Sequence, residues 1–206
     1  ADLCQRLGFE HHIIDFRDNF KESVIQNFID EYMNGRTPNP CVLCNATIKW
    51  GKLIAVADEM GCDFIATGHY AQICEENGHH YLCNAVDTKK DQTYFLWRIK
   101  EEILSRTIFP LGKYHKPEVR LMASERGYEK LSKKMESQEI CFVPNDDYRE
   151  FLRNSVSDYD QKCVPGHFVD MQGRKIGMHE GFQNYTIGQR KGLGLSLPAP
   201  LYVIRL

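Results

Sequence analysis

Two cysteines three positions apart, Cys41 and Cys44, are the residues of this 206-residue sequence whose type and spacing most directly predict chemistry. They follow a proline-rich stretch, "GRTPNP" at 35–40, and precede a segment of helical periodicity. Such a pair serves metal binding, disulfide exchange or nucleophilic sulfur chemistry. A closed zinc site needs four ligands, and the sequence holds no second close pair, so zinc is disfavoured. Because a helix N-terminus stabilises a thiolate, we expect a lowered pKa and reactive sulfur at Cys44.

Two further stretches indicate chemistry only weakly on their own. "SQEICFVP" at 137–144 predicts that Cys141 lies on a short strand, where a buried structural cysteine is the simplest interpretation. "ATGHYA" at 66–71 ends an apolar strand, so Gly68 permits close approach of a ligand and His69 faces the crevice at the strand ends. A structural, capped histidine explains the second stretch equally well.

The order of the expected elements predicts the fold class. An apolar strand at 11–16 precedes a helix from a cap at Asp18 to 34, a second helix from Thr47 to 61, and a buried strand at 63–69. This β-α-α-β alternation predicts an α/β protein with a doubly wound parallel sheet. An Asn-Gly turn within 71–87 predicts a hairpin, and helices are expected at 90–99 and 116–127.

The composition and the residue pattern of the sequence change near Pro144. Glycines and short alternating runs crowd the stretch after 163, which predicts a small β-rich module. We therefore expect two domains, 1–143 and 144–206, with the acidic segment 145–161 as the connector.

Charge and cysteine content bound the function classes. Residues 88–134 carry twelve positive and six negative charges, and residues 162–206 carry six and two, although the whole chain has a net charge of −2. These basic segments suggest a polyanion-binding face, with an ordinary solvated surface as the alternative. The eight cysteines are irregularly spaced, which favours a reducing, cytoplasmic location with most thiols in the core. No apolar run approaches the ~20 residues of a membrane span.

Taken together, six ordered motifs resemble one known family. "GRTPNPCVLCNATIKW", "ATGHYA", "KDQTYFL", "FPLGKYHKPEVR", "SQEICFVPN" and "YTIGQRKGLG" are similar, over nearly the whole chain, to the tRNA-specific 2-thiouridylases (the MnmA/TrmU family). The resemblance implies a Rossmann-like, adenine-nucleotide alpha-hydrolase-like domain and a small β-rich central domain. It also implies a cytoplasmic sulfurtransferase that uses ATP and Mg²⁺ to form 2-thiouridine at the wobble position of tRNA.

The resemblance also implies roles for individual residues. Cys44 and Cys141 would be the catalytic pair, with the persulfide on Cys141 and a disulfide within reach of both. Gly68 would contact ATP. The partners would be tRNA and a sulfur-relay donor protein or cysteine desulfurase. The residues expected to contact tRNA are Asn39, Pro40, Cys41, His69, Lys90, Asp91 and Gln92.

Two departures from the family pattern qualify these expectations. Many members carry an aspartate where this chain has Cys41, so an alternative is an iron–sulfur cluster on Cys41, Cys44 and Cys141. The family's phosphate loop, SGG-x-DS, and its C-terminal barrel are not among these residues, so we expect a fragment that is inactive alone. The rival hypotheses are a tRNA-binding remnant without catalysis and another ATP-dependent ligase of the same fold.

Overall fold

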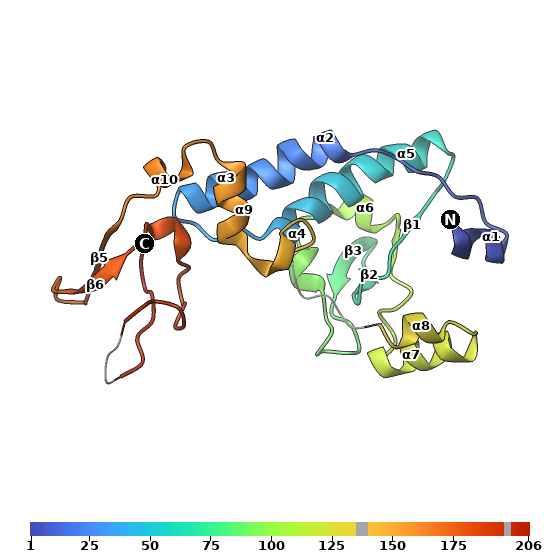
Figure 1. Ribbon diagram of the computed structural model, residues 1–206. Coiled ribbons are helices and arrows are strands. Elements are labelled where there is room, and N and C mark those ends of the chain that lie inside the picture. The colour runs from blue at the N-terminus through green and yellow to red at the C-terminus, as the bar shows by residue number, and fades with distance from the viewer. Residues whose placement is uncertain (135–139, 196–198) are drawn as a thin grey trace.

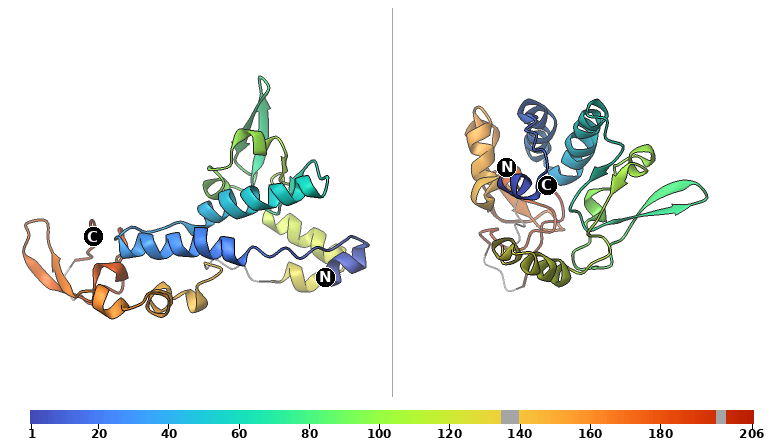
Figure 2. Two further views of the ribbon diagram at one scale, coloured as in Figure 1. Left: turned by 90° about the horizontal axis from the view of Figure 1, so that it is seen from above. Right: turned by 90° about the vertical axis from the view of Figure 1, so that its right-hand side faces the viewer.

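The computed structural model describes residues 1–134, 140–195 and 199–206. Its main feature is a pair of neighbouring helical rods. The first rod joins α2 (Arg17–Phe20), a π-helical segment (Lys21–Ile25) and α3 (Gln26–Met33). The second rod joins α4 (Pro40–Cys44), a longer π-helical segment (Asn45–Lys52) and α5 (Leu53–Glu59). The two rods lie side by side in every view (Figures 1 and 2).

The second rod begins seven residues earlier than the predicted start at Thr47, so that prediction is wrong. Asn39 is the N-cap, and its side-chain oxygen accepts the backbone N–H of Val42 at 3.3 Å. Pro40 occupies the first helical position, where its fixed φ suits the helix and its missing N–H costs nothing. Cys41 and Cys44 therefore lie within the helix and not in a loop before it.

The first rod confirms the predicted helix but not its cap. The rod begins at Arg17, and the residue before it, Phe16, has no side chain that can cap the helix. The carboxylate of Asp15, rather than that of Asp18, accepts the Arg17 N–H at 3.0 Å. The rod ends at Asn34 and Gly35, as the sequence indicates.

A parallel pair of short strands lies beside the second rod. β1 (Ile65–Ala66) pairs with β4 (Thr107–Ile108), with Ile65 opposite Thr107. The predicted strand at 63–69 is thus confirmed only at its centre. The predicted strand at 11–16 is wrong, because no strand of the described residues pairs with this segment and Ile13 is 88% exposed.

The core beneath this pair is centred on Trp50, which is fully buried. Its indole Nε1–H donates to Thr107 Oγ1 at 2.9 Å, so the indole ties the second rod to β4. The other buried members of this cluster are Ala71, Leu96, Ile99, Leu104 and Phe109.

The predicted hairpin is confirmed as β2 (Gln72–Glu76) and β3 (His79–Cys83). Asn77 and Gly78 both have positive φ, 53° and 79°, as a two-residue hairpin turn requires. A disulfide joins Cys74 to Cys83 across the strands, a bond that the sequence did not predict. The expectation of mostly buried thiols is also wrong, since Cys163 is the one buried free cysteine among the described residues.

Shorter helices complete the first part of the chain. The segment predicted as a helix at 90–99 holds only a 3₁₀ turn at Thr93–Phe95, followed by α6 (Glu101–Leu104). The helix predicted at 116–127 is confirmed as α7 (Lys116–Glu125), and a turn at Gly127 separates it from α8 (Glu129–Ser132). N-terminal α1 (Asp2–Leu7) lies near α8, where Arg6 covers the ring of Tyr128 at 5.2 Å.

The segment after Val143 is partly helical. A 3₁₀ turn (Pro144–Asp146), α9 (Tyr148–Ser155) and α10 (Tyr159–Lys162) make up the expected connector. They pack Leu152 and Tyr159 against Phe28 of α3 in one apolar cluster. The hairpin of β5 (Gly166–Val169) and β6 (Lys175–His179) follows, and then a 3₁₀ turn at Phe182–Asn184. The domain boundary at 143/144 stays a prediction.

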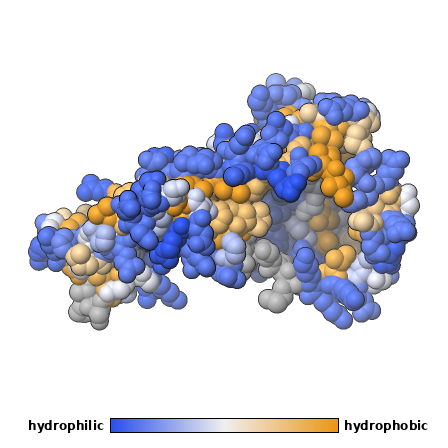
Figure 3. Space-filling view, turned by 45° about the horizontal axis from the view of Figure 1, so that its top comes forward, coloured by the Kyte–Doolittle hydropathy of each residue, from blue (hydrophilic) through white to orange (hydrophobic). Residues whose placement is uncertain are grey.

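The face seen in Figure 3 is mostly hydrophilic, with hydrophobic residues in a band along the elongated part and in smaller patches elsewhere. Within the described part of the chain, no helix combines the length and the apolar character that crossing a membrane requires.

Candidate functional site

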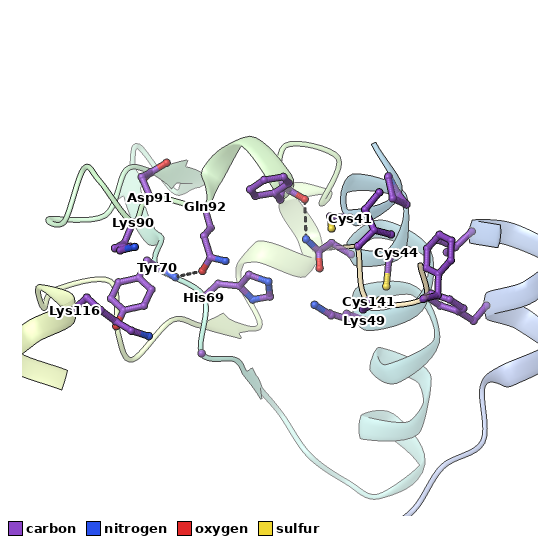
Figure 4. A pocket seen from close by; sticks show the side chains of 18 of the residues that line it. Cys41, Cys44, Lys49, His69, Tyr70, Lys90, Asp91, Gln92, Lys116 and Cys141 are labelled. Atoms are coloured by element: carbon purple, nitrogen blue, oxygen red, sulfur yellow. Dashed lines mark hydrogen bonds between the residues drawn. The ribbon is translucent and has the colours of Figure 1, made fainter. Parts of the chain in front are cut away.

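A cavity of about 710 Å³ lies between the second rod, the end of β1 and the turn that carries Cys141. Nine of the ten residues predicted for the site line this cavity or its rim; the tenth, Asn39, caps α4 just outside the lining. Figure 4 shows the cysteines and Lys49 on one side, Lys90, Tyr70 and Lys116 on the other, and His69 between them. The lining residues are Phe20, Val24, Pro40, Cys41, Cys44, Asn45, Lys49, Gly68, His69, Tyr70, Lys89, Lys90, Asp91, Gln92, Phe95, Lys116, Ile140, Cys141 and Phe142.

The first side of the cavity is a thiol wall, defined by Cys41, Cys44 and Cys141. All three thiols are free; Cys44 is half-buried and the other two are exposed. The structure thus brings together cysteines about a hundred residues apart in the sequence. The predicted strand at Cys141 is wrong within the described residues, because 140–143 form a turn; residues 137–139 lie outside the described part.

Aromatic packing holds the turn that carries Cys141. The ring of Phe142 packs edge-on against the rings of Phe28 and Phe20, with centroid distances of 5.2 Å and 5.6 Å. Both partners belong to the first rod. Such contacts favour one placement of the turn. Cys141 is therefore positioned by its neighbour's contacts with the first rod.

The electrostatics of the thiol wall differ from expectation. Partial desolvation by the cavity wall is the largest influence and raises the pKa of both Cys41 and Cys44 above the ordinary thiol value, although the Cys41 side chain remains exposed, so the lowering predicted for Cys44 is wrong. The Lys49 ammonium opposes this effect and lowers the pKa of both thiols. Sequence reasoning missed Lys49. The signal that could have found it is its place five residues after Cys44, which a π-helical segment brings towards the same face.

Asn45 is a second residue that sequence reasoning missed. It is 2% exposed and lies directly after Cys44. Its amide N–H donates to the Phe95 carbonyl at 2.9 Å, which fixes the orientation of the amide. Its Oδ1 has no hydrogen-bond partner among the described residues. Asn45 therefore ties the rod to the 3₁₀ turn at 93–95.

Gly68 and His69 lie just after the end of β1 and line the cavity, although the strand itself ends earlier than predicted, at Ala66. Burial and, to a smaller extent, Lys49 lower the pKa of His69 to about 4, so the ring is neutral at neutral pH. Its Nδ1 lies 2.9 Å from Thr67 Oγ1, and the ring centroid lies 5.4 Å from that of Trp50. A Cβ at Gly68 would meet only Leu111 Cδ1, at 3.8 Å. The backbone here is thus open to the close approach of a ligand.

The opposite side of the cavity is a lysine wall, defined by Lys89, Lys90 and Lys116. Two of the residues predicted to contact tRNA also organise this wall. The Asp91 carboxylate accepts the backbone N–H groups of Ala85 and Thr93. Gln92 Oε1 accepts the Tyr70 N–H at 2.9 Å. Their contact with tRNA stays a prediction.

The iron–sulfur alternative does not fit this arrangement. Across residues 1–134, 140–195 and 199–206, no group of three or more His, Cys, Asp or Glu side chains is arranged to hold a metal ion. The thiol wall is included in that statement. We therefore derive no step through a cluster or through Mg²⁺.

The family models that match the chain define a class of protein: an α/β domain of the HUP type, which is nucleotide alpha-hydrolase-like and Rossmann-like, joined to a small barrel domain. Residues 1–145 match the family described as "tRNA methyl transferase HUP domain". Residues 150–206 match the family described as "tRNA methyl transferase PRC-barrel domain". The predicted fold class is therefore confirmed.

The relatives narrow this class. The chain is 52% identical to "tRNA-specific 2-thiouridylase MnmA 3" of Bacteroides fragilis over 205 residues, covering 100% of this chain and 56% of that protein. It is 52% identical to the "tRNA-specific 2-thiouridylase MnmA" of Cytophaga hutchinsonii, with the same coverage. The protein of that name from Desulfitobacterium hafniense is 44% identical, covering 98% of this chain and 54% of that protein.

The chain belongs to this family of tRNA-modifying proteins, and the resemblance to the tRNA-specific 2-thiouridylases is confirmed. The chain spans about half the length of the curated relatives it matches.

Proposed function

We propose that the protein containing this chain is an ATP-dependent tRNA-uridine 2-sulfurtransferase, which transfers sulfur from a cysteine persulfide to C2 of the wobble uridine. The observation that carries the proposal is the thiol wall: three free cysteines from two distant segments line one cavity. Sulfur transfer needs one thiol to carry the sulfur and a second to resolve the bond, and a pair of free cysteines on one wall of a cavity suits both roles.

Two cysteines of the thiol wall, Cys44 and Cys141, have proposed roles in the sulfur-transfer step. Cys141 carries the transferred sulfur as a persulfide, supplied by a sulfur-relay protein or a cysteine desulfurase. The terminal sulfur attacks C2 of the uridine, and the activated C2 oxygen leaves. The Cys44 thiolate then attacks the Cys141 sulfur. The bond to the transferred sulfur breaks, a Cys44–Cys141 disulfide forms, and the released electron pair completes the thiocarbonyl group.

The surroundings support this division of labour. Lys49 partly offsets the burial that raises the pKa of Cys44, and so assists formation of its thiolate. Neutral His69 and the first turn of the second rod, with Asn39, Pro40 and Cys41, are the proposed contacts of the tRNA base. ATP, when bound, supplies the adenylyl group that makes the C2 oxygen a leaving group. The open backbone at Gly68 is the proposed contact for that nucleotide.

The matching family carries methyl transfer in its description, and its relatives carry thiolation in their names. The thiol wall favours thiolation, because methyl transfer from a cofactor needs no pair of cysteines. The thiol wall also favours thiolation over the two rival functions, tRNA binding without catalysis and the reaction of a related ATP-dependent ligase, since neither requires paired reactive thiols.

The test compares cysteine variants of the protein that contains this chain. We expect Cys44→Ser and Cys141→Ser each to abolish 2-thiouridine formation, measured by nucleoside mass spectrometry of tRNA after incubation with ATP and a sulfur donor. Cys62→Ser is the matched control, because Cys62 is free and exposed but lies outside this cavity. Full thiolation by Cys44→Ser, or transfer of a labelled methyl group that survives both changes, would contradict the proposal.

A further inference from the structure

The lysine wall is assembled by a buried carboxylate that no motif of the sequence singles out. Asp87 is 7% exposed, although it lies in a loop between the β2–β3 hairpin and the 3₁₀ turn at 93–95. A buried carboxylate needs compensating hydrogen bonds, since its desolvation is otherwise costly. The partners of Asp87 show what this buried charge organises.

Both carboxylate oxygens of Asp87 accept backbone N–H groups of lysines. Oδ1 accepts the N–H of Lys89 at 3.1 Å, and Oδ2 accepts the N–H of Lys116 at 2.9 Å. The N–H of Lys90 donates to the Asp87 backbone carbonyl at 3.0 Å. The hydrogen bonds of Asp87 therefore tie together all three lysines of the wall.

The side chain of Lys116 has a further contact that directs it. Its Nζ lies 5.3 Å from the centre of the Tyr70 ring. Tyr70 is 4% exposed, and Gln92 holds its backbone, so the ring is a fixed support. An ammonium group over a buried ring keeps its charge and retains free N–H donors towards the cavity.

The carboxylates of Asp87, Asp91 and Glu118 on this side of the cavity already accept backbone N–H groups. Asp87 faces backbone N–H groups, with His115 Nδ1 at 3.9 Å, and Asp91 binds Ala85 and Thr93. Among the described residues, neither Lys89 nor Lys116 forms an ion pair. Within the described part of the chain, their ammonium groups thus have no carboxylate partner at the cavity wall, an arrangement that suits a phosphate group.

We propose that Asp87 is a positioning residue which sets the backbones of Lys89 and Lys116 on one wall, and that this wall binds a phosphate group of the substrates. The inference rests on the proposed function only for the source of that phosphate, which is either the tRNA backbone or the nucleotide. The binding measurements that test it require no thiolation, so its failure and a failure of the proposed function are distinguishable.

The first experiment measures how the affinity for a tRNA transcript depends on salt, for the protein that contains this chain. The logarithm of the binding constant falls linearly with the logarithm of the salt concentration, and each lost phosphate contact makes this slope shallower by about 0.7–0.9. We expect Lys89→Gln combined with Lys116→Gln to remove about two contacts, and Asp87→Asn to remove at least one. Asp87→Asn should lower the slope no further when both lysines are already replaced. A purely structural role of Asp87 would not produce this dependence on the lysines.

The matched control is Asp170→Asn. Asp170 is also a turn carboxylate that accepts two backbone N–H groups, those of Gln172 and Arg174, each at 2.9 Å, but it lies outside the cavity. Its replacement should leave the slope unchanged. If Asp87→Asn does not fold, Asp87→Glu keeps the charge and displaces both backbones by one methylene, and a smaller loss of slope is expected.

A second arm identifies the source of the phosphate by calorimetric binding of inorganic pyrophosphate. If the lysine double variant has a shallower salt dependence of tRNA affinity but binds pyrophosphate normally, the wall contacts the tRNA backbone. Lost pyrophosphate binding with an unchanged slope assigns it to the nucleotide. If neither quantity changes, or if Asp87→Asn lowers the slope equally without the lysines, the inference is overturned.

Discussion

The thiol wall and the lysine wall face the same cavity but are fixed by different interactions. Cys41 and Cys44 lie within the capped helix α4, and Cys141 is positioned by the aromatic contacts of its neighbour Phe142. The lysine wall is fixed by backbone hydrogen bonds to the buried carboxylate of Asp87. Apolar packing thus fixes the reactive sulfur, whereas a buried charge fixes the surrounding cations. The two walls should therefore respond differently to mutation, pH and salt.

The largest expected effect is on the apolar support of the thiol wall. Trp50→Ala should lower the free energy of unfolding by about 3–5 kcal/mol, because it leaves a cavity in the core and removes the donor to Thr107. Trp97→Ala is the control, since Trp97 is 65% exposed, and its cost should be small. Urea unfolding measures both. Equal losses would show that the second rod does not depend on its buried indole.

Lowering the pH should reduce the free energy of unfolding by a smaller amount, because His69 lies between the two walls and titrates. Since the folded state holds the pKa of His69 at about 4, below its ordinary 6.5, protons bind the unfolded state first as the pH falls. Stability should therefore decline between about pH 6.5 and 4, by up to about 2 kcal/mol after allowance for partial solvent exposure.

The comparison for that prediction is His69→Gln, which lacks the titrating group. The difference in unfolding free energy between the two proteins should narrow or reverse as the pH falls from about 7 to about 4.5. A difference that stays constant over this range would contradict a neutral, buried ring at His69.

Lys49 should affect the thiol wall by charge rather than by packing. Lys49→Met should raise the pKa of Cys44 further, because burial then acts without the opposing ammonium. Alkylation of Cys44 by iodoacetamide at about pH 8, followed by tandem mass spectrometry, should slow several-fold. Lys49→Arg should restore most of the rate. Lys52→Met is the control on the same helical segment, outside the cavity, and an equal slowing there would argue against a specific role of Lys49.

The smallest expected effect is at the start of the second rod. Asn39→Ala removes the N-cap acceptor of the Val42 N–H and should cost about 1 kcal/mol, whereas Asn39→Asp should keep the cap. Thermal unfolding of the three proteins measures this difference. If Asn39→Asp is as destabilising as Asn39→Ala, the side chain has another role than capping.

Much of the local structure could be predicted from the sequence. The helix that ends at Asn34 and Gly35, the hairpin about Asn77 and Gly78, and α7 are all confirmed, because caps and turn residues act over a few positions. The strand predicted at 11–16 failed for the opposite reason. A strand exists only with a hydrogen-bonded partner, and periodicity does not supply one.

The sequence alone determined the family, the α/β class and the residue types of the site, since ordered motifs and helical or strand periods are local properties of the chain. Only the tertiary structure decided how those residues behave. It placed Lys49 beside the thiols, let burial raise the pKa of Cys44, and used Asp87 to join Lys89 to Lys116. The physical reason is that desolvation and long-range hydrogen bonds depend on neighbours distant in sequence, so they exist only once the chain has folded.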